Sequence, residues 1–149
     1  MVLKRFGVLA ILFRFDASAF SPLFLVMHRK LNWSGWELLK GGIEPNESEE
    51  TALKREIFEE SGLQKVEIVK HLDTNMVYWD SAHRIENELS VYLVRADPSE
   101  TVSFAHNVVQ EHDDFAWLSE TDAIKKLKFS DTKRLIRLAV QEIERLDLR

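Results

Sequence analysis

Three glutamates near the middle of the chain have the spacing of ligands on one face of a helix. Ser48 is suited to cap the start of this helix, and Gly62 is suited to end it. At 100° per residue, Glu56, Glu59 and Glu60 share an arc of about 100°. Like charges at this spacing repel, but Mg²⁺ or Mn²⁺ turns the repulsion into attraction because both cations accept oxygen ligands. The glutamates alone indicate either a divalent-cation site or a solvated acidic face.

The residues around these glutamates decide between the two interpretations. The segment 41–63 reads GGIEPNESEETALKREIFEESGL. Its fixed positions are, in order, Gly41, Glu47 after five residues, Arg55-Glu56 after seven more, aliphatic Ile57, Glu59-Glu60, Gly62 and aliphatic Leu63. This order resembles the signature of the Nudix hydrolases without a mismatch, so we interpret the segment as a Nudix box.

The resemblance implies both a fold and a reaction. Nudix hydrolases are α/β/α sandwiches that cleave a nucleoside diphosphate linked to another moiety, using Mg²⁺ or Mn²⁺. By this resemblance Glu56, Glu59 and Glu60 are metal ligands, and one of them also helps to activate water. A backbone carbonyl beside the box glycine, from Lys40 or Gly41, adds a further ligand. Such metals neutralise phosphate charge and lower the pKa of bound water, so the expected nucleophile is water.

Other positions of the box have structural roles. The resemblance gives Glu47 and Arg55 an ion pair that holds the loop against the helix. The pair Gly41-Gly42 allows the backbone to approach phosphate and metal, which a side chain would hinder. Two positions depart from a common form of this region, because Leu39 replaces a proline and Asn46 replaces a glycine. Neither departure removes a carboxylate ligand.

Outside the box, two stretches are similar to the asymmetric diadenosine tetraphosphate hydrolases. The first runs from Trp36 through Lys40-Gly41 to Pro45, and the second is QEHDDFAWL at 110–118. In that group the glutamate that matches Glu111 serves the metal site or acts as a base. Lys40 is suited to bind a phosphate oxygen, and Trp36 either stacks on a base or packs under the loop.

Three more residues are candidates for substrate contact. His28-Arg29 ends an expected strand near the cleft and could contact a phosphate or a base. Tyr92 is a stacking candidate, although an aromatic residue in a strand belongs more often to the core. The five histidines of the chain do not have the spacing of zinc ligands.

The rest of the sequence predicts the elements that position this site. Apolar and β-branched runs favour strands at 6–15, 23–29, 66–79, 85–96 and 115–118, and the short segment 36–39 completes the three strands expected before the box helix. The segment 40–47 lacks periodicity and contains two adjacent glycines, so we expect a loop there. A short helix is expected after Ser119. Ser130 is suited to cap the last helix, which has an apolar stripe formed by Leu135, Ala139, Ile143 and Leu146. The order β-β-β-α-β-β-β-α-α predicts an α/β fold with a mixed sheet covered by helices.

The composition excludes several classes of function. The 149 residues carry a net charge of −5, and the box accounts for all of it, with seven glutamates against one lysine and one arginine. Without a basic excess, general nucleic-acid binding is not expected. The absence of cysteine excludes disulfides, thiolate metal sites and cysteine nucleophiles. The length suits one domain, which we expect to span 1–149.

The N-terminus has some features of a secretory leader. Residues 1–5 are basic, 7–13 are apolar, and Ala-Ser-Ala at 17–19 mimics a cleavage site. However, Arg14 and Asp16 interrupt the apolar run, which is also shorter than a membrane span. We therefore expect a core strand here, no membrane contact and a cytoplasmic location.

The sequence thus predicts metal-dependent hydrolysis of a small nucleotide polyphosphate by water attack on phosphorus, foremost of a dinucleoside tetraphosphate. One alternative is a pyrophosphohydrolase of the same family that acts on nucleoside triphosphates, ADP-ribose or capped RNA. A second is a nucleotide-binding Nudix module without catalysis, which the retained glutamates disfavour. The sequence leaves the choice between a monomer and a homodimer open.

Overall fold

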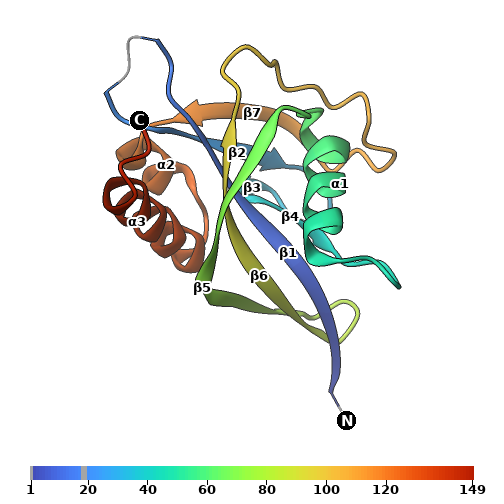
Figure 1. Ribbon diagram of the computed structural model, residues 1–149. Helices are drawn as coiled ribbons and strands as arrows, with labels where there is room; N and C mark the ends of the chain where they lie inside the picture. Colours follow the sequence, from blue (N-terminus) through green and yellow to red (C-terminus); the bar gives the residue numbers. More distant parts are fainter. Residues whose placement is uncertain (1, 18–19) are drawn as a thin grey trace.

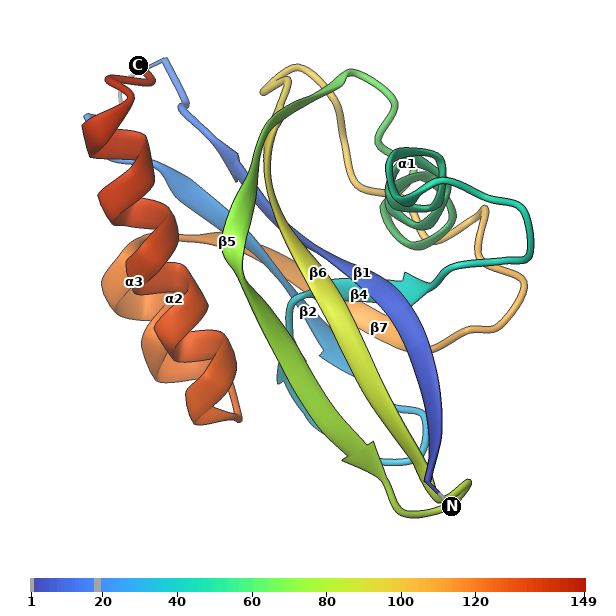
Figure 2. The same ribbon diagram turned by 60° about the horizontal axis from the view of Figure 1, so that its bottom comes forward.

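A mixed β-sheet forms the centre of the molecule, with one helix on one face and two helices on the other (Figures 1 and 2). The computed structural model describes residues 2–17 and 20–149. Within these residues the strands are β1 (Leu3–Arg14), β2 (Leu23–Arg29), β3 (Gly35–Glu37), β4 (Leu39–Gly42), β5 (Val66–Asp80), β6 (Ile85–Ala96) and β7 (His112–Leu118). The helices are α1 (Glu49–Ser61), α2 (Glu120–Lys126) and α3 (Ser130–Arg145). The predicted α/β fold with a mixed sheet is confirmed.

The sheet splits along β1, and this split positions the site. The central path runs β3-β2-β1-β6-β5, with β1 parallel to β6. β1 pairs with β2 only through Phe13 and Arg14, and with β4 through the four residues from Gly7 to Ala10. β7 pairs with the outer side of β2. The strands β2, β3 and β7 therefore diverge from β4, and side chains from both groups meet where they part.

Alternation along β1 produces two cores. Leu9, Ile11 and Phe13 pack toward α2 and α3, whereas Val8 and Ala10 pack toward α1. Successive residues of a strand point to opposite faces, so this continuous apolar run is buried on both sides. The three-layer α/β/α arrangement follows from the burial of both faces.

Helix α1 has the termini that the sequence predicts. The Ser48 side chain accepts a hydrogen bond from the Thr51 backbone N–H, and Gly62 ends the helix with φ of 75°. Only glycine adopts this left-handed conformation without a steric penalty, and the Gly62 N–H closes the last turn on the Phe58 carbonyl. Helix α2 is likewise capped by Ser119, as expected.

Three expectations about local structure are wrong. The segment 40–47 is not a loop throughout, because Lys40 to Gly42 belong to β4 and pair with β1. At α3 the N-cap is Phe129, without a side-chain capping hydrogen bond, rather than Ser130. Leu146 follows the end of α3 and is 37% exposed, so the apolar stripe ends at Ile143. These errors share a cause, because pairing between distant strands and the exact end of a helix leave little local pattern.

Two expectations about the N-terminal region have different outcomes. The strand expected at 6–15 is present as β1, and it begins earlier, at Leu3. Residues 18 and 19 of the Ala-Ser-Ala motif lie outside the described residues. Among the residues that are described, no helix is both long enough and apolar enough to cross a membrane.

Candidate active site

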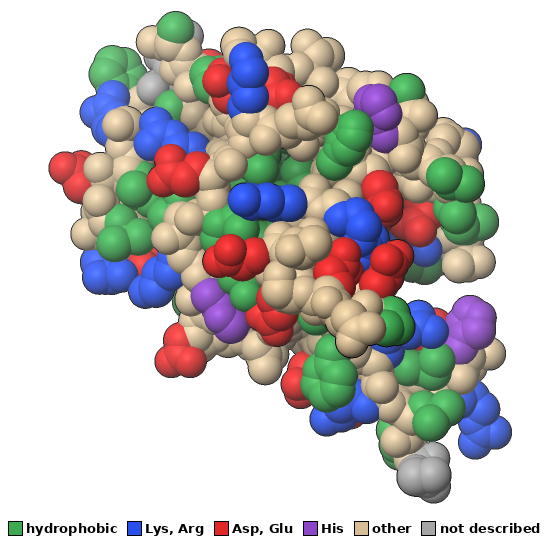
Figure 3. Space-filling model, turned by 45° about the vertical axis from the view of Figure 1, so that its right-hand side comes forward, with side chains coloured by type: hydrophobic (Ala, Val, Ile, Leu, Met, Phe, Trp, Pro, Cys, Tyr) green, Lys and Arg blue, Asp and Glu red, His purple; other side chains and the backbone are tan. Residues whose placement is uncertain are grey.

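Helix α1 presents the three box glutamates at different depths. Glu60 is 4% exposed and points into the region where the sheet splits, whereas the Glu59 side chain is 45% exposed. The Glu56 side chain lies between these extremes at 12% exposed. Figure 3 shows acidic side chains gathered on the face that carries α1, with basic side chains among them. The helix therefore offers a graded set of carboxylates rather than a uniformly solvated face.

Arg55 fixes the loop that precedes α1. Its guanidinium donates to both oxygens of Glu47, at 2.7 and 2.8 Å, and to the Gly42 carbonyl at 2.9 Å. The same group donates to Glu56 Oε1 at 2.8 Å. The hydrogen bonds from Arg55 hold the pKa of Glu47 at about 2, so this pair stays ionised at neutral pH. Arg55 thus connects the strand, the loop and one carboxylate of the helix.

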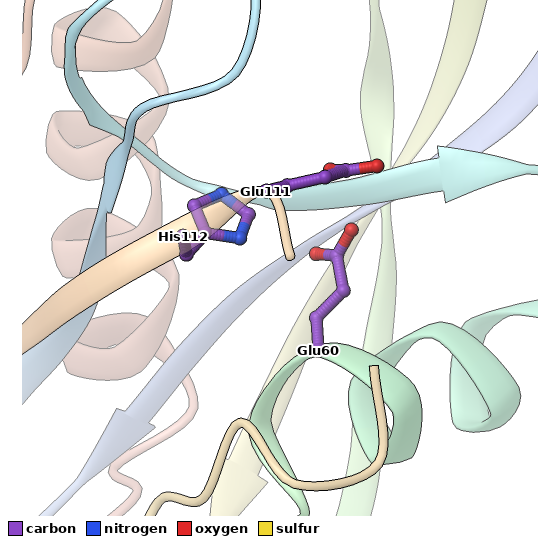
Figure 4. A group of neighbouring side chains, drawn as sticks. All are labelled: Glu60, Glu111 and His112. Carbon is purple, nitrogen blue, oxygen red and sulfur yellow. The ribbon is translucent and has the colours of Figure 1, made fainter. Parts of the chain in front are cut away.

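Glu60 lies close to two residues at the start of β7. Ligand atoms of Glu60, Glu111 and His112 all lie within 4.8 Å of one another. Figure 4 shows the Glu60 and Glu111 carboxyl groups on adjacent sides of one space, with the His112 ring at its edge. Glu60 Oε2 and His112 Nδ1 are buried and have no hydrogen-bond partner among the described residues. The structure therefore brings together Glu60 and Glu111, which the sequence proposes as ligands, and adds His112.

The electrostatics of this cluster favour a cation. Burial raises the pKa of Glu60 well above its usual range, and the charges of Glu111 and Glu56 raise it further. Burial also raises the pKa of Glu56 to about 7, although Arg55 opposes the shift. Both shifts mean that ionised carboxylates are unfavourable here without compensation. A divalent cation bound here would supply the missing positive charge.

A buried glutamate on β3, Glu37, connects the cluster to two basic side chains. Glu37 Oε1 lies 3.2 Å from the Arg29 guanidinium and 3.0 Å from His112 Nε2, and Glu37 Oε2 lies 3.6 Å from Lys40 Nζ. Arg29 also contacts Glu111, at 3.3 Å. Burial acts to raise the pKa of Glu37, but the His112 hydrogen bond and the nearby cations hold it below the ordinary value. Glu37 is therefore an ionised carboxylate that orders its neighbours.

Sequence reasoning missed Glu37 and His112. The signal for Glu37 was a single charge within the apolar run Trp36–Leu39, and the signal for His112 was a histidine directly after the candidate Glu111. Neither signal reveals that the two side chains meet, because 75 residues separate them.

An aromatic pocket lies on the face of β4 that is turned toward α2 and α3, opposite the face that α1 covers. It measures about 240 Å³ and is lined by Leu9, Trp33, Glu37, Leu38, Lys40, Tyr78, Phe129 and the first residues of α3. Lys40 Nζ lies 5.0 Å from the centre of the Tyr78 ring, and Trp33 meets Phe129 edge to face at 5.3 Å. Glu37 lines this pocket and also contacts His112 of the carboxylate cluster, so Glu37 and its partner Lys40 link the two regions.

Both box glycines contact side chains of α1. Gly41 follows Lys40 in β4 and lies against the Glu56 carboxyl group on the α1 face. Gly42 receives the Arg55 hydrogen bond through its carbonyl.

Three of the proposed substrate contacts are not part of the cluster formed by Glu60, Glu111 and His112. The His28 ring faces Trp36 at 5.3 Å on the α2 side, and its Nδ1 lies 2.6 Å from Asp113. Trp36 packs against the core and also contacts Lys126. Tyr92 is 6% exposed and donates its hydroxyl hydrogen to Glu49 at the start of α1. The structure does not bring Tyr92 into the pocket.

Comparison with known families agrees with the box. The NUDIX domain model matches residues 3–138. The chain belongs to the Nudix family.

Several Nudix proteins resemble the chain at different levels. The asymmetrical bis(5′-nucleosyl)-tetraphosphatase of Caenorhabditis elegans is 26% identical over 114 residues, which cover 76% of this chain and 80% of that protein. The RNA pyrophosphohydrolase of Haemophilus ducreyi is 34% identical over 74 residues, which cover 50% of this chain and 34% of that protein. The chain thus matches only about a third of the length of that relative. A C. elegans Ap4A hydrolase binary complex has a TM-score of 0.72 at 23% identity, with 89% and 93% of the two chains covered, which shows a shared fold.

The donor set of this Nudix chain suits a divalent cation. Glu60 offers a buried oxygen that has no hydrogen-bond partner within the described part of the chain. Glu111 lies beside it, and Glu56 is one turn away on the same helix. Carboxylate oxygens are the ligands that Mg²⁺ and Mn²⁺ accept. The residues present therefore fit the metal that the family resemblance implies.

Proposed function

We propose that this Nudix protein hydrolyses nucleotide polyphosphates, with a dinucleoside tetraphosphate as the preferred substrate. The observation that carries the proposal is the aromatic pocket joined to the carboxylate cluster through Lys40 and Glu37. A base fits between aromatic side chains, and the phosphates then extend toward the glutamates. The tetraphosphatase from C. elegans, similar over most of both chains, supports the choice of substrate.

The pocket is suited to one nucleoside of the substrate. Tyr78, Phe129 and Trp33 give it aromatic walls, and stacking on such rings is worth about 1–3 kcal/mol per base. Lys40, at the boundary of the pocket, offers an ammonium group to the first phosphates. Glu37 holds this ammonium in place through the 3.6 Å ion pair, so Lys40 is ordered before the substrate binds.

The carboxylates bind the reacting end. A divalent cation at this site would neutralise phosphate charge and lower the pKa of the attacking water. Glu56, Glu59, Glu60 and Glu111 would hold the cation, and one of them would accept the proton of the water. Arg55 keeps Glu56 in place, and Arg29 does the same for Glu111. The reaction class is pyrophosphate hydrolysis by water attack on phosphorus.

A substrate panel with product analysis tests the proposal. Purified protein with Mg²⁺ or Mn²⁺ is incubated with diadenosine tetraphosphate, nucleoside triphosphates, ADP-ribose and 5′-triphosphorylated or capped RNA. We expect ATP and AMP from diadenosine tetraphosphate at the highest kcat/KM. Cleavage of ADP-ribose alone contradicts the choice of substrate, and failure to cleave any member contradicts the enzymatic function.

A second candidate is the 5′ end of RNA. The similarity to the RNA pyrophosphohydrolase of H. ducreyi, although confined to half of this chain, favours its inclusion. The pocket can accept a terminal base equally well, and the two substrates differ in the group attached at the far end of the phosphate chain. Faster release of pyrophosphate from triphosphorylated RNA than cleavage of diadenosine tetraphosphate would favour this candidate.

A further inference from the structure

The hydrogen bond between Glu37 and His112 assigns the two ring nitrogens of His112 different roles. Nε2 lies 3.0 Å from Glu37 Oε1. The ionised carboxylate can only accept a hydrogen bond, so Nε2 carries the hydrogen. In a neutral imidazole the other nitrogen, Nδ1, then has a free lone pair. The His112 side chain is 1% exposed, so water does not reach this lone pair freely.

The lone pair of His112 faces the carboxylate cluster. Nδ1 is buried and has no hydrogen-bond partner in residues 2–17 and 20–149, and the same holds for Glu60 Oε2. Figure 4 shows a ring nitrogen of His112 on the side toward Glu60. Ligand atoms of these two residues and of Glu111 lie within 4.8 Å of one another. Two buried acceptors, Glu60 Oε2 and His112 Nδ1, are unfavourable without a donor, and a cation between them and Glu111 would satisfy both.

The support behind His112 is typical of a metal ligand. A histidine that binds a metal usually donates its other ring N–H to a carboxylate, which fixes the tautomer and the direction of the ring. Glu37 supplies this carboxylate and is itself held by Arg29 and Lys40. We propose that His112 Nδ1 is a metal ligand together with Glu60 and Glu111, so the site combines nitrogen with oxygen.

A nitrogen ligand changes which cations the site favours. Imidazole suits transition metals, whereas Mg²⁺ prefers oxygen ligands in an octahedral arrangement. The proposal therefore names the class of cation as a divalent transition metal, with Mn²⁺ as the probe. The proposal rests on the proposed function in one respect, because the same cation would serve hydrolysis. Its test does not depend on that function, since metal binding is measured without substrate.

Pulsed electron paramagnetic resonance of bound Mn²⁺ tests the proposal directly. One equivalent of Mn²⁺ is added to the purified protein, and the spin-echo modulation is recorded for unlabelled protein and for protein with ¹⁵N-histidine. We expect nitrogen modulation in the unlabelled protein and its replacement by the ¹⁵N pattern after labelling. Modulation without a nitrogen contribution, or failure of Mn²⁺ to bind, overturns the proposal.

Matched variants assign the nitrogen to one histidine. In His112→Gln we expect loss of the nitrogen signal and a roughly 10- to 100-fold weaker Mn²⁺ affinity by calorimetry. Mg²⁺ affinity should change by less than about threefold, because Mg²⁺ gains little from a nitrogen ligand. His83→Gln, in the turn between β5 and β6, is the control and should keep both signal and affinity. Retention of the signal in His112→Gln overturns the assignment.

The outcomes separate this inference from the proposed function. Cleavage of diadenosine tetraphosphate together with Mn²⁺ binding that lacks a nitrogen signal would support the proposed function and overturn the assignment of His112. A histidine nitrogen signal in a protein that cleaves no nucleotide would support the assignment of His112 and overturn the proposed function.

Discussion

Gly41 and Glu56 lie so close that a Cβ at position 41 would overlap the Glu56 carboxyl group. The backbone of β4 and the side chain of α1 occupy adjacent space only because position 41 has no side chain. Gly41 is not among the residues with positive φ, so close approach rather than unusual backbone conformation requires glycine here. The glycine and the glutamate of the box are therefore parts of one contact.

Substitution of this glycine should displace the carboxylate. We expect Gly41→Ala to lower kcat by about 100-fold, because a shift of about 1 Å in a reacting group has such an effect. At Gly42 the nearest atom to an added Cβ is 4.0 Å away, so Gly42→Ala should cost much less. Steady-state kinetics of both variants make the comparison, and equal losses would argue against the contact with Glu56 as the cause.

Glu60 should be required for catalysis and should lower the thermal stability of the metal-free protein. We expect Glu60→Gln to lower kcat by roughly two to three orders of magnitude, because it removes a buried ligand charge. In the presence of a chelator, the same variant should unfold at a higher temperature than the parent, since burial disfavours the carboxylate. Unchanged turnover would refute the metal assignment.

The metal-free protein should lose stability as the pH rises. The pKa of Glu56 is raised to about 7 from 4.5, mainly by burial. Its stabilising effect is complete below pH 4.5 and disappears as the pH rises through 7, because the folded state binds the proton more tightly. Thermal unfolding in chelator between about pH 4.5 and 8 measures this slope. Glu56→Gln should flatten it, and an unaltered slope would contradict the role of Glu56.

Arg55 should be irreplaceable by lysine. A guanidinium donates to Glu47, Glu56 and the Gly42 carbonyl at once, whereas an ammonium group cannot match this geometry. We expect Arg55→Lys to destabilise the protein by about 2 kcal/mol and to lower kcat as Glu56 loses its support. Denaturant unfolding measures the loss. Lys54→Arg, at an exposed position of the same helix, is the control, and equal stability of the two variants would contradict the role of Arg55.

The aromatic pocket should control affinity rather than chemistry. We expect Tyr78→Ala and Phe129→Ala each to raise KM by roughly 10-fold or more with little change in kcat, through lost stacking on the base. Trp79, which is 53% exposed beside Tyr78, provides the control substitution Trp79→Ala. A fall in kcat without a change in KM would place the pocket outside the substrate path.

The predictable part of this molecule is the part with local signals. The bounds of α1 follow from Ser48 and Gly62, because capping depends on residues within one turn of the helix end. The spacing of the glutamates on α1 is fixed by the helix itself. The strand at Lys40–Gly42 escaped prediction because its identity depends on pairing with Gly7–Leu9, more than thirty residues away in the sequence.

The pocket and the histidine escaped prediction for a similar reason. Tyr78 and Phe129 become neighbours only when β5 and the start of α3 meet over β4. Nothing near His112 in the sequence shows that Glu37 will orient its ring. The hydrogen bond from the Tyr92 hydroxyl to Glu49 likewise leaves no local pattern in the sequence, because 43 residues separate the two. The cytoplasmic location and the choice between monomer and homodimer stay predictions.

Lys40 and Gly41 are consecutive residues of one strand, yet one borders the aromatic pocket and the other borders Glu56 on the opposite face. If the base of the proposed substrate binds in this pocket, its phosphates extend from one face of β4 to the other to bring the scissile bond to the carboxylates. Strand β4 would then set the number of phosphates between the anchored nucleoside and the cleaved bond. A series of dinucleoside polyphosphates of increasing chain length should be cut at a constant number of phosphates from one end.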